Sequence, residues 1–382
     1  MDCRLTLQFF ALSAIAGCAS HQLLFPPPDP PPSLAPWTDC AAGTPDCNPC
    51  AVDVMARFAA FGAGAFVEET HDWTFDWEAT VPPAPQPVSR YFDPSIDARN
   101  RHADAFGAHV QGFVRTNDPI IRFAGTHSNA PGMKGAIFFV RQENGANRLA
   151  ALHEGFTRHP SGVAVLGNYL LVGEKKMLRV FDVTAPASPQ TIARRMPADD
   201  PEKRGMNPPG GGIAAVKLAD GDYLFVVTTP GGTADGPRYH RFYRLSGDLS
   251  GPDLRAAFMG EQRLDGPGGF LFSENLSLVA ECGTGRIFAV HTGTRRALST
   301  RGYWRLSVLD EESGHPVLVP VALFEQPQNL RNCHLKSAAT AWVSPAGTIE
   351  FYCHEYINNP DRGSVDTWHF RRFFESGKGT GQ

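Results

Sequence analysis

Short apolar runs separated by turn residues dominate the chain from residue 109 onward. The runs are rich in Val, Ile, Phe and Tyr, and no long stretch between them has the period of a helix. Gly167-Asn168 and Asp220-Gly221 are typical of the turns between them. This pattern predicts an antiparallel all-β fold. The clearest runs lie at 135–140, 162–166, 168–173, 178–183, 212–216, 222–227, 240–245, 276–282, 286–291 and 348–353.

The strand pattern repeats along the chain. Four-stranded propeller blades take about 40 to 50 residues each, and longer spacings indicate insertions. The repeat predicts a β-propeller over 109–374 with five four-stranded blades, or six if 265–330 is divided. Aligned first strands begin near residues 109, 159, 209, 274 and 334, which gives spacings of 50, 50, 65 and 60 residues.

One segment of the repeat resembles a known family. LRVFDVTAPASP (178–189) ends a strand in Asp and continues into a short loop that contains Pro. It resembles the repeat of secreted bacterial β-propellers, in particular the LVIVD-type repeat family. The resemblance covers most of 109–374 and implies an architecture, because propellers of this kind serve many unrelated activities.

A propeller ring has to close, and the last blade shows only three strands of its own. The segment WTFDWEATV (73–81) alternates strictly between apolar and polar residues. This alternation predicts a half-buried strand that completes the last blade. Before it, Val52, Met55 and Phe58 have helical spacing, so we expect a short helix over 51–61 packed on the rim.

The N-terminus has the features of an export signal. An apolar run (5–16) is shorter than the span of about 20 residues that a bilayer needs, and fits the h-region of a signal peptide. It ends in Ile-Ala-Gly-Cys18, which resembles a bacterial lipobox. The resemblance implies that 1–17 is a lipoprotein signal peptide, that Cys18 is lipidated, and that Ala19 favours the outer membrane. The alternative is ordinary secretion, with cleavage at an Ala-x-Ala site.

A Pro-rich run follows at 25–37. Proline lacks the backbone N–H and fixes φ, so the run predicts a stiff spacer of roughly 35 Å. It would form a stalk within a tether (18–50) that separates the lipid from a folded body. Residues 51–108 then hold the helix and closing strand, and 375–382 form a flexible tail. No later stretch has 18 consecutive apolar residues, so we expect no other membrane segment.

Six cysteines follow the lipobox. An even number in an exported chain favours disulfides, and six cysteines allow fifteen connectivities. In Cys47-Asn-Pro-Cys50, Ala51 replaces the His of a haem site and no βαβ context supports a redox role, so a structural disulfide is favoured. Cys333 and Cys353 flank a predicted hairpin and are expected to lie close together. The candidates are Cys40, Cys47, Cys50, Cys282, Cys333 and Cys353.

Composition and charge exclude several classes of protein. The 32 Pro and 38 Gly exclude a long helical bundle or coiled coil, while 42% hydrophobic residues, 26 of them Phe, are enough for a folded core. A net charge of −4, from 35 basic and 39 acidic residues, offers no basic surface. We therefore expect no nucleic-acid partner.

We expect the candidate metal-binding or ligand-binding residues to lie at one mouth of the propeller axis. The first strand of each blade lines the axis, so the residues at the five strand starts should meet there. Three histidines and a glutamate among them would suit a divalent metal such as zinc, iron or calcium. Two other interpretations stay open: a polar recognition mouth without metal, and histidines with structural roles only. The candidates are His109, His159, Glu274 and His334, with Pro209 at the remaining position.

Two classes of function fit these features. The first is a membrane-anchored extracytoplasmic binding module, held in the bilayer by an acyl anchor and binding a small molecule or an envelope protein at the axial mouth. The alternative is a metal-dependent hydrolase or lyase, in which Glu274 acts as ligand or base and the metal activates water. No nucleophile elbow or phosphate loop defines catalytic residues. The expected location is the bacterial cell envelope, or the periplasm or exterior if the chain is secreted.

Overall fold

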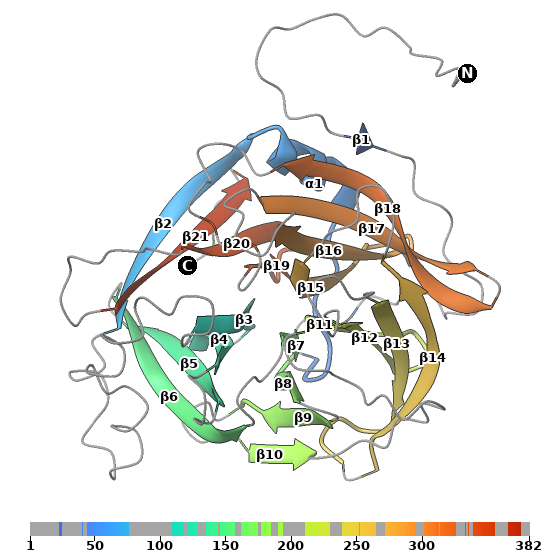
Figure 1. The fold of residues 1–382 in the computed structure, drawn as a ribbon, viewed down its shortest axis with the longest axis horizontal. Helices are drawn as coiled ribbons and strands as arrows, with labels where there is room; N and C mark the ends of the chain where they lie inside the picture. The colour runs from blue at the N-terminus through green and yellow to red at the C-terminus, as the bar shows by residue number, and fades with distance from the viewer. Residues whose placement is uncertain are drawn as a thin grey trace, which may run out of the picture.

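Five antiparallel sheets surround a central axis in the computed structural model of the chain, so the predicted five-bladed β-propeller is confirmed (Figure 1). The blades follow one another around the ring, and in each the first strand lies at the axis and the fourth at the outside. The structure describes residues 23–24, 40, 44–75, 109–117, 121–128, 135–143, 146–156, 162–174, 177–184, 190–193, 211–229, 239–251, 253–264, 272–294, 302–312, 314–325, 333, 335, 339–355 and 366–375.

The first four blades are each built from consecutive strands. Blade 1 contains β3 (His109–Arg115), β4 (Ile121–Ser128), β5 (Gly135–Glu143) and β6 (Ala146–Phe156). Blade 2 contains β7 (Val163–Leu166), β8 (Tyr169–Glu174), β9 (Met177–Asp182) and β10 (Gln190–Ala193). Blade 3 contains β11 (Ile213–Lys217), β12 (Tyr223–Thr229), β13 (Tyr239–Ser246) and β14 (Arg255–Arg263). Blade 4 contains β15 (Phe272–Ala280), β16 (Ile287–Thr294), β17 (Gly302–Glu312) and β18 (His315–Glu325).

Blade 5 combines the two ends of the ring. It contains β19 (Ala339–Val343), β20 (Ile349–Glu355), β21 (Asp366–Glu375) and, from the N-terminal side, β2 (Phe66–Phe75). The five first strands therefore begin within five residues of the predicted positions. The six-blade alternative is wrong, because the long stretch from β15 to β18 forms one sheet.

The closing strand is confirmed, but it begins earlier than predicted. β2 pairs with β21 over ten positions, from Phe66 opposite Glu375 to Phe75 opposite Asp366. The predicted strand (73–81) overlaps it only at its end, and 76–81 lies outside the described residues. The start was missed because β2 is the outermost strand of its blade and needs no apolar alternation: Val67 is 39% exposed.

The predicted helix is present as α1 (Val54–Gly62), with a different apolar face. Asp53 caps it by accepting a hydrogen bond from the Ala56 N–H (3.4 Å), so Val52 precedes the helix and is 51% exposed. Met55 is only partly buried, and the buried face consists of Val54, Phe58 and Phe61.

The helix fills the wedge between blades 4 and 5 rather than resting on their rim. Phe61 stacks on Phe351 of β20 with ring centroids 4.1 Å apart, and Phe58 packs against Phe324 of β18 at 5.0 Å. The same cluster includes Trp304 of β17, so helix and both blades share one core. Among the described residues, no helix is long and apolar enough to cross a membrane.

The six candidate cysteines form three pairs, which selects one of the fifteen connectivities. The Cα atoms lie within the range of disulfides in each pair. Cys333 and Cys353 lie close together, as expected. The pairs are Cys40–Cys47 (Cα–Cα 6.0 Å), Cys50–Cys282 (5.1 Å) and Cys333–Cys353 (5.5 Å).

A short N-terminal strand, β1 (Leu23–Leu24), adds a fifth strand to blade 4. It pairs antiparallel with β18, Leu23 opposite Leu323 and Leu24 opposite Ala322. The predicted stalk (25–37) lies outside the described residues, but the chain contacts the propeller on both sides of it.

The wedge position of α1 predicts a large effect of its central phenylalanine. Phe61→Ala removes a buried ring from a core shared by two blades, and we expect a loss of about 3–5 kcal/mol in the free energy of unfolding. Val52→Ala, at an exposed position just before the helix, is the control and should change it by less than about 0.5 kcal/mol. Chemical denaturation measures both, and equal effects would contradict the wedge.

Candidate functional site

The five inner strands β3, β7, β11, β15 and β19 run in the same direction along the axis and define two faces. Short turns join the first and second strands of each blade at one end, for example at Gly167-Asn168 and at 219–222. We call this end the turn face. The opposite end, where the inner strands begin, is the loop face.

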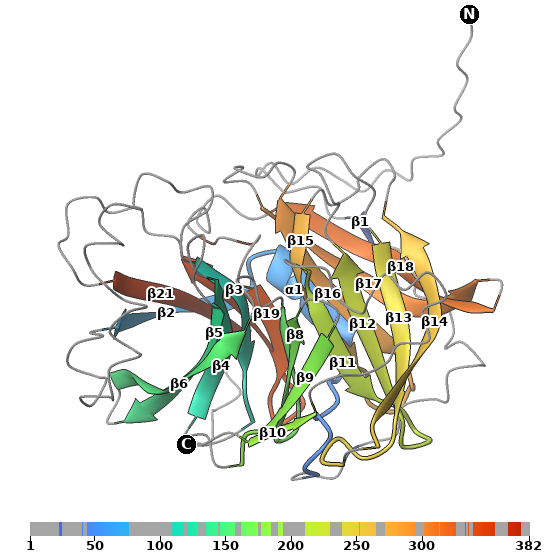
Figure 2. The same cartoon turned by 60° about the horizontal axis from the view of Figure 1, so that its bottom comes forward.

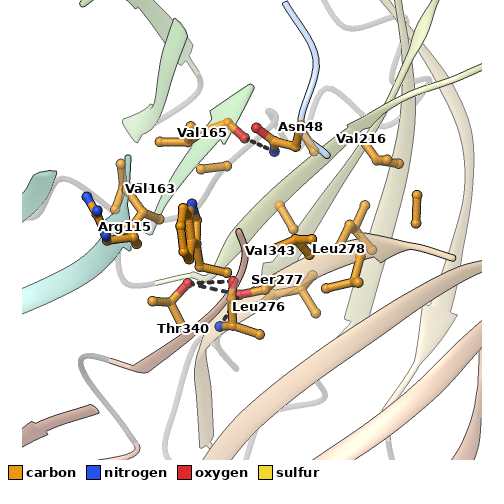
Figure 3. Close-up of a pocket in the computed structure, with 18 of the residues that line it drawn as sticks. Asn48, Arg115, Val163, Val165, Val216, Leu276, Ser277, Leu278, Thr340 and Val343 are labelled. Carbon is orange, nitrogen blue, oxygen red and sulfur yellow. Dashed lines mark hydrogen bonds between the residues drawn. The ribbon is translucent and has the colours of Figure 1, made fainter. Parts of the chain in front are cut away.

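The axis holds a narrow channel, with a cavity of about 50 Å³ (Figure 3). One water needs about 10–15 Å³, so the cavity has room for only a few waters. Aliphatic side chains from several blades line it, and Val163, Val165, Leu276 and Val343 are among them. A narrow apolar channel cannot admit a ligand of ordinary size, so recognition has to take place at a mouth.

The polar groups of the channel wall bond to each other. The Ser277 and Thr340 hydroxyls lie 3.1 Å apart, and the Ala341 N–H donates to Ser277 Oγ (3.1 Å). Arg115 donates to the Thr116 carbonyl (3.1 Å), and its guanidinium lies 4.9 Å from the ring centre of Trp342. These contacts join neighbouring blades along the axis.

The segment Thr44–Val52, which we call the clasp, crosses the turn face (Figure 2). Asn48 lies at the channel wall and is held by three hydrogen bonds. Its amide Nδ2 donates to the Val165 carbonyl of blade 2 (2.6 Å). Its Oδ1 accepts from the Gly167 N–H (3.0 Å) and from Asn117 Nδ2, just after the inner strand of blade 1 (3.2 Å).

An ion pair attaches the clasp to blade 3. Asp46 Oδ2 accepts hydrogen bonds from Lys217 Nζ (2.6 Å) and from the Tyr223 hydroxyl (2.6 Å). Burial acts to raise the pKa of Asp46, but the bonds from Lys217 and Tyr223 outweigh it and lower that pKa below its usual 3.8. Burial and the bond to Asp46 raise the pKa of Tyr223.

Backbone bonds and a disulfide attach the clasp to the last two blades. The Ala51 N–H donates to the Ala280 carbonyl (2.8 Å), and the Cys282 N–H donates to the Ala51 carbonyl (2.9 Å). Cys50 pairs with Cys282 in the same blade. The Val52 N–H donates to the Gly347 carbonyl of blade 5 (3.1 Å). The clasp thus contacts all five blades and closes the channel at the turn face.

The structure does not test whether the predicted metal ligands meet. His109 is the first residue of β3 and Glu274 the third of β15, so both backbone positions lie toward the loop face, as expected. Their side chains, and all of His159, Pro209 and His334, lie outside what the structure describes. Within the described residues, no group of three or more His, Cys, Asp and Glu side chains could hold a metal.

Two histidines in the seam between blades 3 and 4 were not among the candidates. His240 of β13 and His291 of β16 are completely buried, with ring centroids 4.8 Å apart. His240 Nδ1 lies 3.1 Å from the Thr228 hydroxyl, and both ring nitrogens of His291 are buried without a hydrogen-bond partner in this part of the chain. Burial, with the positive charge of Arg305, lowers the pKa of both well below 6.5.

Sequence signals for these features are weak. His240 begins and His291 ends an apolar run that was identified as a strand, and nothing local shows that two blades bring them together. The clasp has one visible signal, its Cys-x-x-Cys motif. The hydrogen bond that Lys217 donates to Asp46 of the clasp joins residues 171 positions apart, which no single sequence reveals.

The clasp predicts a larger loss of stability at one of two comparable turn glycines than at the other. Gly167 and Gly221 both have positive φ (+55° and +92°), so alanine strains the backbone at either. Only at Gly167 would the added Cβ meet the clasp, 2.3 Å from the Pro45 carbonyl oxygen, whereas nothing lies within 4 Å at Gly221. Gly167→Ala should therefore lower the free energy of unfolding by about 1–3 kcal/mol more than Gly221→Ala. Limited proteolysis should also cut the clasp only in the first variant, and equal results would rule out this seating of the clasp.

The buried histidines predict an acid-sensitive seam. Their folded-state pKa values lie below the unfolded value of 6.5, so the unfolded chain binds more protons as pH falls. Stability should be constant above that pH and decline below it, by roughly 1.4 kcal/mol per pH unit for each histidine. Urea denaturation across this range measures the slope. His291→Leu should reduce it, and a slope equal to that of the unsubstituted protein would contradict the assignment.

Comparison with known proteins assigns neither a family nor an activity to the chain. No protein-family model and no curated protein matches the chain, so the resemblance to the LVIVD-type family stays a prediction. A candidate 6-phosphogluconolactonase from Bacteroides uniformis is similar at 15% identity and a TM-score of 0.33, over 70% of this chain and 71% of that one. An endo-1,4-β-xylanase from Bacteroides thetaiotaomicron is similar at 12% identity and a TM-score of 0.37, over 69% and 89%. Similarity at this level assigns no activity to the present chain.

Proposed function

We propose that the protein is a membrane-anchored extracytoplasmic binding module that takes a small molecule or an envelope protein at the loop-face mouth of its propeller. The observation that carries the proposal is the clasp. It closes the channel at the turn face with Asn48 and with contacts to all five blades. The channel itself has room for only a few waters, which leaves the loop face for recognition.

Two features of the chain support an extracytoplasmic location. Cys18 follows a lipobox-like sequence, and three cysteine pairs suit an oxidising compartment. An acyl chain on Cys18 would hold the protein in the bilayer, and Ala19 favours the outer membrane. The pair of Cys50 and Cys282 would then keep the clasp covalently in place outside the cytoplasm.

Binding at the loop face follows from how the blades are built. The inner strands are stiff, buried and joined to each other, so they fix where the loops begin. Connecting segments on such a scaffold are free to vary and are the usual site of recognition. The turn face lacks this freedom, because its turns at Gly167 and Gly347 contact the clasp.

The test compares two exposed arginines at opposite ends of one strand. Arg255 begins β14 at the turn face and Arg263 ends it at the loop face. A photo-crosslinking amino acid is placed at either position, and the full chain is irradiated in the producing bacterium. We expect a specific adduct from position 263 and none from position 255. Adducts from position 255 alone, or none from a panel of positions at the loop face, would overturn the proposal.

The alternative function, a metal-dependent hydrolase or lyase, leads to a different expected result for the same protein. It requires stoichiometric bound metal that is lost in His109→Ala, His159→Ala and His334→Ala. The binding module requires neither, and its crosslinked adduct should persist after chelation of divalent metal. Metal analysis of protein purified without a His tag separates the two. Metal lost in all three variants, together with an adduct that disappears on chelation, would favour the enzyme.

A further inference from the structure

The seam between blades 3 and 4 changes from apolar to polar along its strands. Phe242 of β13 and Ala289 of β16 belong to an apolar cluster that contains residues of both blades. Two residues away on the same faces of these strands, the seam holds His240 and His291 instead. Both histidines are completely buried, and their ring centroids lie 4.8 Å apart. A polar layer thus lies beside the apolar contact between the two blades.

Blade 4 adds two more polar side chains to this layer. Arg305 of β17 lies opposite His291, and Ser307 lies two residues further along the same face of the strand. Diagonal neighbours on one face of a sheet are about 7–8 Å apart, which is within reach of an aromatic ring. Ser307 is completely buried and lies opposite Ala289, so two short side chains adjoin the ring of His291.

Four polar atoms of the layer have no hydrogen-bond partner in the part of the chain that the structure describes. They are His240 Nε2, both ring nitrogens of His291 and Ser307 Oγ, and all four are buried. A buried polar group without a partner costs free energy, and in native proteins such groups are usually bonded to ordered water or to an ion. Their grouping in one seam indicates that a polar species binds between the blades.

The charge around the layer indicates which species this is. Burial, together with the positive charge of Arg305, lowers the pKa of both histidines well below 6.5, so both rings are neutral at pH 7. A metal cation would be repelled by the same charge, and the described residues contain no group of three metal-ligating side chains. An anion would be attracted to it.

The hydrogen-bonding groups of the layer also suit an anion. A neutral imidazole carries one N–H. The Thr228 hydroxyl lies 3.1 Å from His240 Nδ1 and can donate to it, which places the N–H of that ring on Nε2. His291 has one N–H as well, and the Ser307 hydroxyl is a third donor. All three can donate to a single acceptor.

We propose that the seam between blades 3 and 4 binds a small inorganic anion of the size of chloride. It accepts hydrogen bonds from the ring N–H groups of His240 and His291 and from the Ser307 hydroxyl, while Arg305 supplies the opposite charge. The ion has to be small, because the two rings pack closely and the space beside them is that left by short side chains. The site joins two blades and does not depend on the ligand proposed for the loop-face mouth.

Thermal unfolding in two salts tests the proposal. Protein purified without halide is heated at neutral pH in sodium chloride or in sodium gluconate of equal ionic strength. A ligand that binds only the folded state raises the unfolding midpoint, so chloride should raise it along a saturable curve. Gluconate is too large for the seam and should give no saturable rise. Identical curves in the two salts would overturn the proposal.

Two substitutions locate the chloride effect. Ser307→Ala removes one donor and should weaken the apparent chloride affinity about tenfold, which corresponds to one hydrogen bond to a charged group. Ser246→Ala, at the other end of β13 from His240, is the matched control and should leave the affinity unchanged. His291→Leu should abolish the saturable rise. Chloride affinity that is the same in Ser307→Ala and in the unsubstituted protein would contradict this site.

Crystals grown in bromide distinguish an anion from ordered water. We expect an anomalous-scattering peak beside His240, His291 and Ser307, because bromide replaces chloride and scatters anomalously. Density at this place without an anomalous signal would mean that water fills the seam, and would refute the proposal.

Discussion

The direction of one strand pairing determines how the rest of the molecule is arranged. β2 closes the ring against β21, with Phe66 opposite Glu375 and Phe75 opposite Asp366. This register places Phe66 beside the end of β21, next to α1, whose Phe61 packs against both Phe66 and Phe373. The chain before β2 runs through the clasp and α1, and the clasp contacts all five blades at the turn face. Ring closure by β2 thus fixes the segment that covers the turn-face mouth.

Much of the ring could be predicted from the sequence because blades 1 to 3 repeat in register. Gly112, Gly162 and Gly212 are 50 residues apart, and a Cβ on Gly162 would lie 2.7 Å from the Ile213 nitrogen of the next blade. Inner strands approach closely at the axis, so glycine is needed there and its spacing shows the period. Blades 4 and 5 lack this marker, and their predicted starts differ from the observed ones in both directions.

The parts that could not be predicted depend on contacts between distant segments. β2 lies at an edge, so its first residues show no apolar alternation. Asn48 of the clasp bonds to Val165, 117 residues away, and His240 meets His291 only because two blades pack together. The candidate ligands His109 and Glu274 were found from strand starts alone, a rule that gives positions along the axis and not the directions of side chains.

A disulfide and an ion pair both stabilise the turn face of the propeller. The pair Cys50–Cys282 joins residues 232 apart, and restricting a loop of that length in the unfolded chain stabilises the fold by about 5 kcal/mol on a chain-entropy argument. Together with the ion pair of Asp46 and Lys217, it concentrates stabilising contacts at the turn face. Stability that is secured at one face leaves the loops of the other face free to change without unfolding the ring. A fold organised in this way can change the connections at its loop face while keeping the same ring.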